Sequence, residues 1–532
     1  MLGNISGHTA VKAGSVLTAL LCAVVFSLAT LNPIYEDEIV YLQLASNFSW
    51  KDFSSPFIYP QCTSTVRRAV PIPLVPAAAL TTAVFSFISS NEALRLMGLL
   101  VTGCNALLLL AFVRRSLGAR ERNIESLILL PLAIGVFPIF LVLARPEGTL
   151  FLLAAGLLSI SLTTTSSTLI MRFLKGLLSF VIVSIAAWIH PGAATLLPLF
   201  LVASWNVGGR GVIGMLCAAV AGAVVVTGVS FHCSGYACHE VPEIESFYSL
   251  YSNELSSLSL LPTIRTFFSS ILDIQPYIEA LLFKTSSGNY WGYYPPVHTQ
   301  YPILYVIANA LGLIPLAILL VMSVATFIQV IRDLSLTERT LKHLPSISVF
   351  ASIALGALAY PIKYAYRAEL FFLLLLLGLA LNGELLRVTC ERVRHMWIAL
   401  FKTSIILSMV FLVILLGPPI FESLFEVHPV EQRISVGIFA SNIRDDEIKK
   451  AANFCQIENY SGATLVDTLT YFYLDDPHAS YLESYVFFHD QDPPSARDYL
   501  KRIKLRNAFV HCDSVPESSV SEFKRFGDLC CF

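Results

Sequence analysis

The sequence predicts an all-α polytopic membrane protein, with about 11 transmembrane helices plus juxtamembrane helices, followed by a small C-terminal α/β extracytoplasmic domain. Three observations lead to this prediction. Of the 532 residues, 55% are hydrophobic and only 14% are charged, whereas soluble proteins carry about 25% charged residues. Apolar runs recur along the chain as far as about residue 418, and several are long enough to cross a bilayer. Beyond residue 424 the charge density rises and the apolar runs shorten.

The apolar runs define the candidate spans. They lie at about 11–31, 69–89, 93–113, 125–143, 149–170, 176–189, 192–205, 211–230, 301–329, 346–360, 368–386 and 396–418. The run at 69–89 opens with Pro71, Pro73 and Pro76, and these prolines break its first turns. We therefore interpret it as a juxtamembrane or re-entrant element, which leaves eleven transmembrane helices.

The distribution of Lys and Arg predicts the orientation, because short loops rich in these residues stay on the cytoplasmic side. With eleven spans and the N-terminus inside, every basic cluster lies inside: Arg114, Arg115, Arg120 and Arg122; Arg172 and Lys175; Arg332, Arg339 and Lys342; and Arg387, Arg392 and Arg394. The transmembrane domain then covers 1–424. It has a first external loop at 32–92 and a long external loop at 231–300. The soluble domain covers 425–532.

The C-terminal segment has the pattern of a mixed α/β domain. Ile434–Ala440, Ala463–Asp467 and Asn507–Cys512 read as short strands, and Asp445–Phe454 and Ala496–Ile503 read as amphipathic helices. We expect one or more of its four cysteines to form disulfides, and the pairing stays open at this point.

Composition also bears on the compartment and the partners. The formal net charge of −2 argues against a nucleic-acid partner, because no basic face is available. The cysteines in polar segments all fall on one side of the predicted topology, which indicates an oxidising compartment: Cys62, Cys233, Cys238, Cys455, Cys512, Cys530 and Cys531. Cys233 and Cys238 bound a short turn-rich loop that could close a disulfide.

Three adjacent carboxylates follow the first apolar run. Glu36, Asp37 and Glu38 lie in the stretch Asn32–Tyr41. Because like charges this close repel, open water, a metal ion, a basic group or a cationic or protic ligand must offset them. A bound Mg²⁺, Mn²⁺ or Ca²⁺ is one interpretation, and a solvated loop is the structural alternative.

Other ionisable and aromatic groups gather on the same predicted face: Arg67, Arg68, Arg95, Glu147, His298, Lys363, Tyr364 and Arg367. Carboxylates beside cations at a lipid–water boundary suit the transfer of a group from a lipid phosphate. The acid deprotonates a hydroxyl or amine acceptor, or holds a metal that does so, and the cations neutralise the phosphate leaving group. Structural alternatives exist, since Arg95 and Arg145 could extend to the interface and His190, before Pro-Gly, reads as a capping or packing residue.

The order of these motifs resembles a known family. Asp37-Glu38-x-x-Tyr41-x-x-x-Ala45 after a first helix is similar to the first-loop motif of the GT-C superfamily of membrane glycosyltransferases. The branch it resembles contains the protein O-mannosyltransferases and the bacterial aminoarabinose and related lipid A sugar transferases. The similarity continues in order over roughly 10–390, through Arg67-Arg68 before Pro71, Asn91–Leu96, Arg114–Gly118, Ala144–Gly148 and His298. One position departs from the pattern, because the second acid is commonly Asp and here is Glu147.

This resemblance implies an integral-membrane enzyme of the bacterial inner membrane whose site and C-terminal domain face the periplasm. It would transfer one sugar from a polyprenyl-phosphate donor to a cell-envelope acceptor (a lipid such as lipopolysaccharide, a polysaccharide or a protein), with inversion. Asp37 would be the catalytic base, and Glu38 and Glu147 would support acceptor or metal binding. The remaining assignments are donor-phosphate binding by Arg67, Arg68, Lys363 and Arg367, and further site roles for Tyr41, Arg95, His298 and Tyr364. No cofactor is required, although a divalent cation could bind at Glu36, Asp37 and Glu147.

Two other functions compete with this prediction. A lipid-linked sugar flippase or transporter would place ionisable groups within helices near the membrane midplane, and the predicted spans are almost free of Asp, Glu and Lys. A sensor formed by the C-terminal domain would need only one or two spans as an anchor, not eleven.

Overall fold

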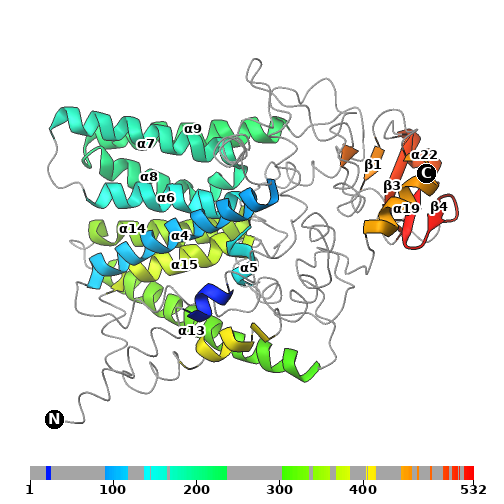
Figure 1. The fold of residues 1–532 in the computed structure, drawn as a ribbon. Helices are drawn as coiled ribbons and strands as arrows, with labels where there is room; N and C mark the ends of the chain where they lie inside the picture. The colour runs from blue at the N-terminus through cyan, green and yellow to red at the C-terminus, as the bar shows by residue number, and fades with distance from the viewer. Residues whose placement is uncertain are drawn as a thin grey trace, which may run out of the picture.

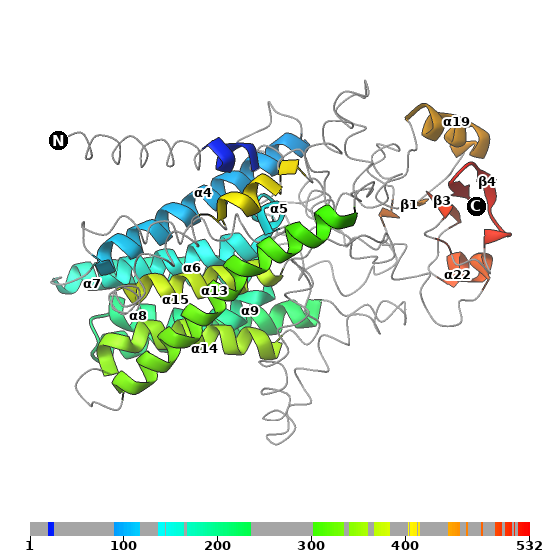
Figure 2. The ribbon, with the colours of Figure 1, turned by 90° about the horizontal axis from the view of Figure 1, so that it is seen from below.

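The computed structural model describes residues 20–25, 90–117, 137–143, 145–163, 168–235, 302–334, 340–359, 367–383, 403, 405–411, 413–414, 445–457, 464–466, 480–481, 495–502, 506–512, 515 and 520–532. Most of these residues are helical. The helices of the apolar part lie side by side (Figures 1 and 2): α4 (Ser90–Leu117), α5 (Phe137–Leu141), α6 (Pro146–Leu162), α7 (Leu169–Ile189), the 3₁₀ helix η2 (Pro191–Leu196), α8 (Leu197–Val207), α9 (Val212–Gly235), α13 (Pro302–Leu334), α14 (Thr340–Ala359) and α15 (Arg367–Leu381).

Contacts at both ends of α4 and α6 show that these two helices run in the same direction. Asn105 of α4 contacts Gly148 in the first turn of α6, and Arg115 near the end of α4 donates a hydrogen bond to the carbonyl oxygen of Leu162 at the end of α6. Glu369, in the first turn of α15, also lies beside Gly148. The helices α4, α6 and α15 therefore begin at one end of the bundle. We call this the acid end, because Glu147 and Glu369 lie there, and we call the opposite end, where Arg114 and Arg115 lie, the basic end.

The other helices alternate between these ends. His343 near the start of α14 pairs with Asp333 at the end of α13, so α13 ends and α14 begins at the basic end. Asn382, after α15, donates to the Ser346 hydroxyl 2.9 Å away at the same end. The helices α7 and α9 both begin at the basic end, and the turn between α8 and α9 lies there as well. The described helices thus follow the alternation that the charge pattern predicts.

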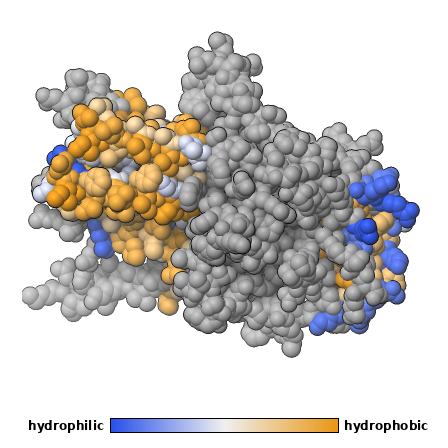
Figure 3. Space-filling model, turned by 90° about the horizontal axis from the view of Figure 1, so that it is seen from above, coloured by the Kyte–Doolittle hydropathy of each residue, from blue (hydrophilic) through white to orange (hydrophobic). Residues whose placement is uncertain are grey.

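The helix α15 is the most buried of the set. From Leu370 to Ala380 its residues are buried or nearly so, and it packs against α4, α6, α13 and α14. A helix that is apolar on all sides is expected in such a central position. In contrast, α7 exposes a continuous set of large apolar side chains, among them Leu169, Ile170 and Phe173. Figure 3 shows the resulting hydrophobic surface over the described helices, which is typical of a lipid-facing surface.

Three of the described helices are long and apolar enough to cross a membrane: Met97–Ser116, Leu169–Ala187 and Val306–Asp333. This agrees with an integral membrane protein, while the total of eleven spans stays a prediction. One boundary was wrong. The apolar run at 149–170 is not one helix, because α6 ends at Leu162 and α7 begins at Leu169 after a Thr- and Ser-rich stretch. Thr168 caps α7 by accepting a hydrogen bond from the backbone N–H of Met171 at 3.5 Å.

The C-terminal residues form a five-stranded sheet in the order β2-β1-β3-β5-β4, accompanied by helices α19 and α22 (Figure 1). Its elements are β1 (Thr464–Val466), β2 (Ser480–Tyr481), β3 (Asn507–His511), β4 (Lys524–Phe526), β5 (Leu529–Cys531), α19 (Asp445–Cys455) and α22 (Ala496–Arg502). β1 pairs with β2 and β3 in parallel, whereas β5 pairs antiparallel with β3 and β4.

Two predicted strands and both predicted helices coincide with β1, β3, α19 and α22. β2, β4 and β5 were not predicted, and the predicted strand at 434–440 lies outside the described residues. The division into domains at 424 also stays a prediction.

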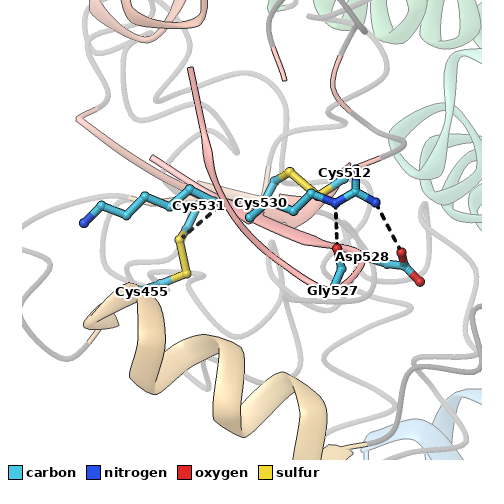
Figure 4. Close-up of a disulfide and its surroundings, with 8 residues drawn as sticks. Cys455, Cys512, Gly527, Asp528, Cys530 and Cys531 are labelled. Carbon is cyan, nitrogen blue, oxygen red and sulfur yellow. Dashed lines mark hydrogen bonds and ion pairs between the residues drawn. A yellow bond between two sulfur atoms is a disulfide. The ribbon is translucent and has the colours of Figure 1, made fainter. Parts of the chain in front are cut away.

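Two disulfides close the C-terminal sheet (Figure 4). Cys455 at the end of α19 is bonded to Cys531 of β5, and Cys512 after β3 is bonded to Cys530, which also belongs to β5. The adjacent residues Cys530 and Cys531 point to opposite faces of the strand, so one strand is linked to two different elements. The prediction of disulfides among these four cysteines is therefore confirmed, and disulfides of this kind are typical of an oxidising compartment.

Replacing Cys531 by Ser should destabilise the C-terminal sheet by about 2–4 kcal/mol, since the Cys455–Cys531 bond closes a loop with a sequence separation of 76 residues. Thermal unfolding with and without a reductant measures the loss. Cys104 is an unpaired, exposed cysteine of α4, so Cys104→Ser is the matched control and should leave the unfolding midpoint unchanged. An equal midpoint for Cys531→Ser and the original protein would contradict the pairing.

Candidate functional site

The turn before α6 places an ion pair at the acid end. Arg145 is the N-cap residue of α6 and Pro146 occupies its first turn, where the missing N–H costs no hydrogen bond. Arg145 Nε donates to Glu147 Oε2 at 3.2 Å, and Arg145 Nη2 donates to Glu147 Oε1 at 3.4 Å. Their side chains are only 2% and 6% exposed. Glu147 also lies in the first turn of α6, where the positive end of the helix dipole favours a carboxylate.

A row of residues on α4 holds this turn in place. Gly98 lies against the backbone of Val142, Thr102 donates a hydrogen bond to the Leu141 carbonyl oxygen, and Asn105 Nδ2 donates to the Gly148 carbonyl oxygen at 3.0 Å. These three residues recur at the spacing that places side chains on one helix face. Thr102 and Asn105 are both buried, so one face of α4 fixes the backbone on either side of the ion pair.

A second acid, Glu369, reaches the same turn from α15. It lies in the first turn of that helix and is 3% exposed. A methyl group added to Gly148 would lie 2.7 Å from Glu369 Oε1 and 3.2 Å from Val101 Cγ1. The carboxylate of Glu369 therefore packs directly on the backbone of Gly148, close enough to interact electrostatically with both Glu147 and Arg145.

The charges of this cluster do not balance among the described residues. Two carboxylates from different helices share the neighbourhood of one guanidinium, and all three groups are buried. Asn105 Oδ1 is a buried acceptor for which the described residues supply no hydrogen-bond donor. The N-termini of α6 and α15 converge here, and their unpaired backbone N–H groups favour negative charge. The arrangement can therefore hold an acid in a defined position beside a cation, as a general-acid–base site requires.

The structure tests only part of the predicted site. Of the predicted catalytic residues Glu147 is described, and it belongs to the cluster. The backbones of Arg95, Cys233 and Arg367 are described within α4, α9 and α15, and Arg367 precedes Glu369 by two residues. The other predicted residues lie outside the described residues: Glu36, Asp37, Glu38, Tyr41, Arg67, Arg68, Cys238, His298, Lys363 and Tyr364. In the described part of the chain, no three His, Cys, Asp or Glu residues gather as metal ligands.

Two interpretations change with the structure, and a third is confirmed. Glu369 was not identified as a site residue from the sequence. The predicted spans were described as almost free of acids, although Glu369 lies in one of them. The signal was an acid in a leucine-rich run directly after Arg367. Arg145 does not extend to the interface, because Glu147 pairs with its guanidinium inside the protein. His190 caps η2 as predicted, since its Nδ1 accepts a hydrogen bond from the N–H of Gly192 at 2.9 Å.

No family model matches the sequence, and the comparison with curated proteins found no match either. The crystal structure of ArnT from Cupriavidus metallidurans bound to undecaprenyl phosphate is a similar solved structure. The similarity covers 97% of this chain and 97% of that chain, at 12% sequence identity and a TM-score of 0.43. Such values are too low to assign a fold or an activity.

Proposed function

We propose that this chain is an integral-membrane glycosyltransferase of the GT-C type. It transfers a single sugar from a polyprenyl-phosphate donor to a lipid, polysaccharide or protein acceptor of the cell envelope. The observation that carries the proposal is the buried cluster of Arg145, Glu147 and Glu369 at the acid end of an apolar helical bundle. The ordered sequence motifs around Asp37 and Glu147 support it, because they resemble the sites of such enzymes.

In the proposed reaction Asp37 accepts a proton from the acceptor hydroxyl, and the acceptor oxygen attacks the anomeric carbon of the sugar. The new glycosidic C–O bond forms while the bond from the anomeric carbon to the phosphate oxygen breaks, so the polyprenyl phosphate leaves with the electron pair. Attack from the face opposite the leaving group inverts the anomeric centre. Arg67, Arg68, Lys363 and Arg367 would neutralise the developing charge on the phosphate.

The described residues suggest how Glu147 contributes. Its carboxylate is fixed by Arg145. The α4 residues Thr102 and Asn105 hold the backbone on either side of it, through the carbonyl oxygens of Leu141 and Gly148. A carboxylate fixed in this way can orient an acceptor hydroxyl without losing further side-chain entropy. Both carboxylate oxygens of Glu147 accept hydrogen bonds from Arg145, and in this proposal Glu147 acts without a metal.

The proposed compartment follows from the disulfides and the charge pattern. The basic end carries the clusters that stay in the cytoplasm, and the C-terminal disulfides require an oxidising environment. Both support a bacterial inner-membrane protein whose acid end and C-terminal sheet face the periplasm.

The test is sugar transfer by the purified full-length chain in lipid nanodiscs, supplied with radiolabelled polyprenyl-phosphate sugars. The released polyprenyl phosphate and the labelled acceptor are measured. Asp37→Asn keeps the shape of the side chain and removes the base, and we expect it to reduce the transfer rate by about a hundredfold or more. Asp52→Asn, in the same predicted external loop, is the matched control and should keep the original rate.

Each proposed role has its own contradicting result. A correctly inserted Asp37→Asn protein with the original rate would exclude Asp37 as the base. The competing transporter function would show as movement of the intact lipid-linked sugar across vesicles, with no release of polyprenyl phosphate. Glu369, the buried acid within a helix, lies in the first turn of α15, whereas a transport pathway needs ionisable groups near the midplane.

A further inference from the structure

The basic end carries a cluster of cations between α7, α8 and α9, far from the acids of the proposed site. The Arg172 guanidinium lies over the turn between α8 and α9, because a methyl group added to Gly209 would lie 3.2 Å from Arg172 Cζ. Arg210, the next residue of that turn, donates from Nε to Asn206 Oδ1 at 2.8 Å. Lys175 follows Arg172 by three residues on α7 and therefore lies on the same helix face.

The cations of this cluster have no ion-pair partner in the described part of the chain. No carboxylate in the described ranges forms an ion pair with Arg172, Lys175 or Arg210. The carbonyl groups at the end of α8 do not need these cations either. The carbonyl oxygens of Ser204, Trp205 and Asn206 already accept hydrogen bonds from the backbone N–H groups of Gly208, Arg210 and Gly209, respectively.

The side-chain amide of Asn206, at the same turn, is only partly satisfied by the described residues. Asn206 is 7% exposed, and its Nδ2 has no hydrogen-bond partner among the residues that the structure describes, although its Oδ1 is bonded to Arg210. The amide is therefore held in the orientation in which its free atom is a donor. The buried Asn206 holds Arg210 at this turn, where Arg172 also lies. Two guanidinium groups around one turn form a site that favours an oxyanion.

The surface beside these cations is apolar. Phe173 on α7 is 70% exposed, and Val212, Met215 and Leu216 on α9 are 68%, 59% and 60% exposed. Figure 3 shows hydrophilic residues at the left margin of the bundle, directly beside the hydrophobic surface. A free phosphate ion would contact only the cations. An anionic phospholipid has both parts, a phosphate for the cations and acyl chains for the exposed side chains.

We infer that the turn between α8 and α9, together with Arg172 and Lys175 of α7, binds the phosphate of an anionic phospholipid whose acyl chains lie along Phe173, Met215 and Leu216. The site lies at the end opposite to the acid cluster and does not depend on the proposed transferase activity. Its occupant holds the start of α7 against the turn that leads into α9.

The experiment measures lipid binding to the full-length chain by native mass spectrometry and by the thermal unfolding midpoint in detergent. The probes are dioleoyl phosphatidylglycerol, dioleoyl phosphatidylcholine and inorganic phosphate. Phosphatidylglycerol should bind tightest and raise the unfolding midpoint. Arg172→Gln/Arg210→Gln should weaken phosphatidylglycerol binding by about 30-fold. Each arginine near a membrane surface raises the affinity for an anionic lipid about fivefold, and the double variant removes two.

The control is Arg114→Gln/Arg115→Gln, which removes two charges from the same end of the bundle but away from this turn. It should weaken binding much less than Arg172→Gln/Arg210→Gln. An equal loss in both double variants would mean general attraction between charges and would overturn the site. The same rise in unfolding midpoint with inorganic phosphate as with phosphatidylglycerol would overturn a phospholipid occupant.

Discussion

Glu147→Gln is expected to destabilise the protein by about 3 kcal/mol, the lower end of the range for a buried ion pair that loses one partner. The substitution keeps the volume of the side chain and leaves the Arg145 guanidinium, whose side chain is 2% exposed, without the carboxylate that faces it in two hydrogen bonds. The loss should not reach the upper end of that range, because Glu369 lies close enough to attract the same guanidinium. The midpoint of thermal unfolding in detergent measures the effect.

Two comparisons make this result specific. Glu447 is exposed on α19, so Glu447→Gln removes the same charge with no expected change in midpoint. The double variant Glu147→Gln/Glu369→Gln removes both acids near Arg145, and its destabilisation should exceed the sum of the two single effects. Additive effects would show that Glu369 does not interact with Arg145, and an unchanged midpoint for Glu147→Gln would show that the pair is not buried.

Gly148→Ala is expected to destabilise the protein by about 1–3 kcal/mol, the usual cost of overpacking a close-packed site. The added methyl group would lie 2.7 Å from Glu369 Oε1, a distance at which one of the groups must move. The opposing effect is helix propensity, which favours Ala over Gly by about 1 kcal/mol. The steric cost outweighs it because Val101 Cγ1, at 3.2 Å, closes the other side of the site.

Gly156 of the same helix is the matched control, because a methyl group there would meet no atom within 4 Å. Gly156→Ala should therefore raise the unfolding midpoint, while Gly148→Ala lowers it. Glu369→Asp withdraws the carboxylate by one methylene, so Gly148→Ala/Glu369→Asp should recover part of the lost stability. If Gly148→Ala raised the midpoint as Gly156→Ala does, the packing of Glu369 on Gly148 would be wrong.

The sequence alone determined the features that depend on composition and local pattern. Apolar runs and the spacing of Lys and Arg predicted the helices of the bundle and their alternation between two ends. Amphipathic periodicity found α19 and α22, and β-rich runs found β1 and β3. His190 before Pro-Gly was interpreted as a capping or packing residue, and the capping bond joins residues only two positions apart. In each of these cases the deciding interactions lie within one element or one turn.

Only the tertiary structure decided which distant groups meet. Glu369 is separated from Glu147 by more than two hundred residues, and its position beside Gly148 follows from the packing of α15 against α4 and α6. The partners of Cys455 and Cys512 depend on the antiparallel pairing of β3 and β5. The sequence pattern did not predict this pairing, because β5 is too short to show a strand periodicity. Extension of Arg145 to the interface was left open as an alternative, because a sequence does not show whether a counter-charge is buried with it. The sequence pattern indicates which face of a helix or strand is buried. Which residues of two distant elements meet is decided by close packing across the bundle.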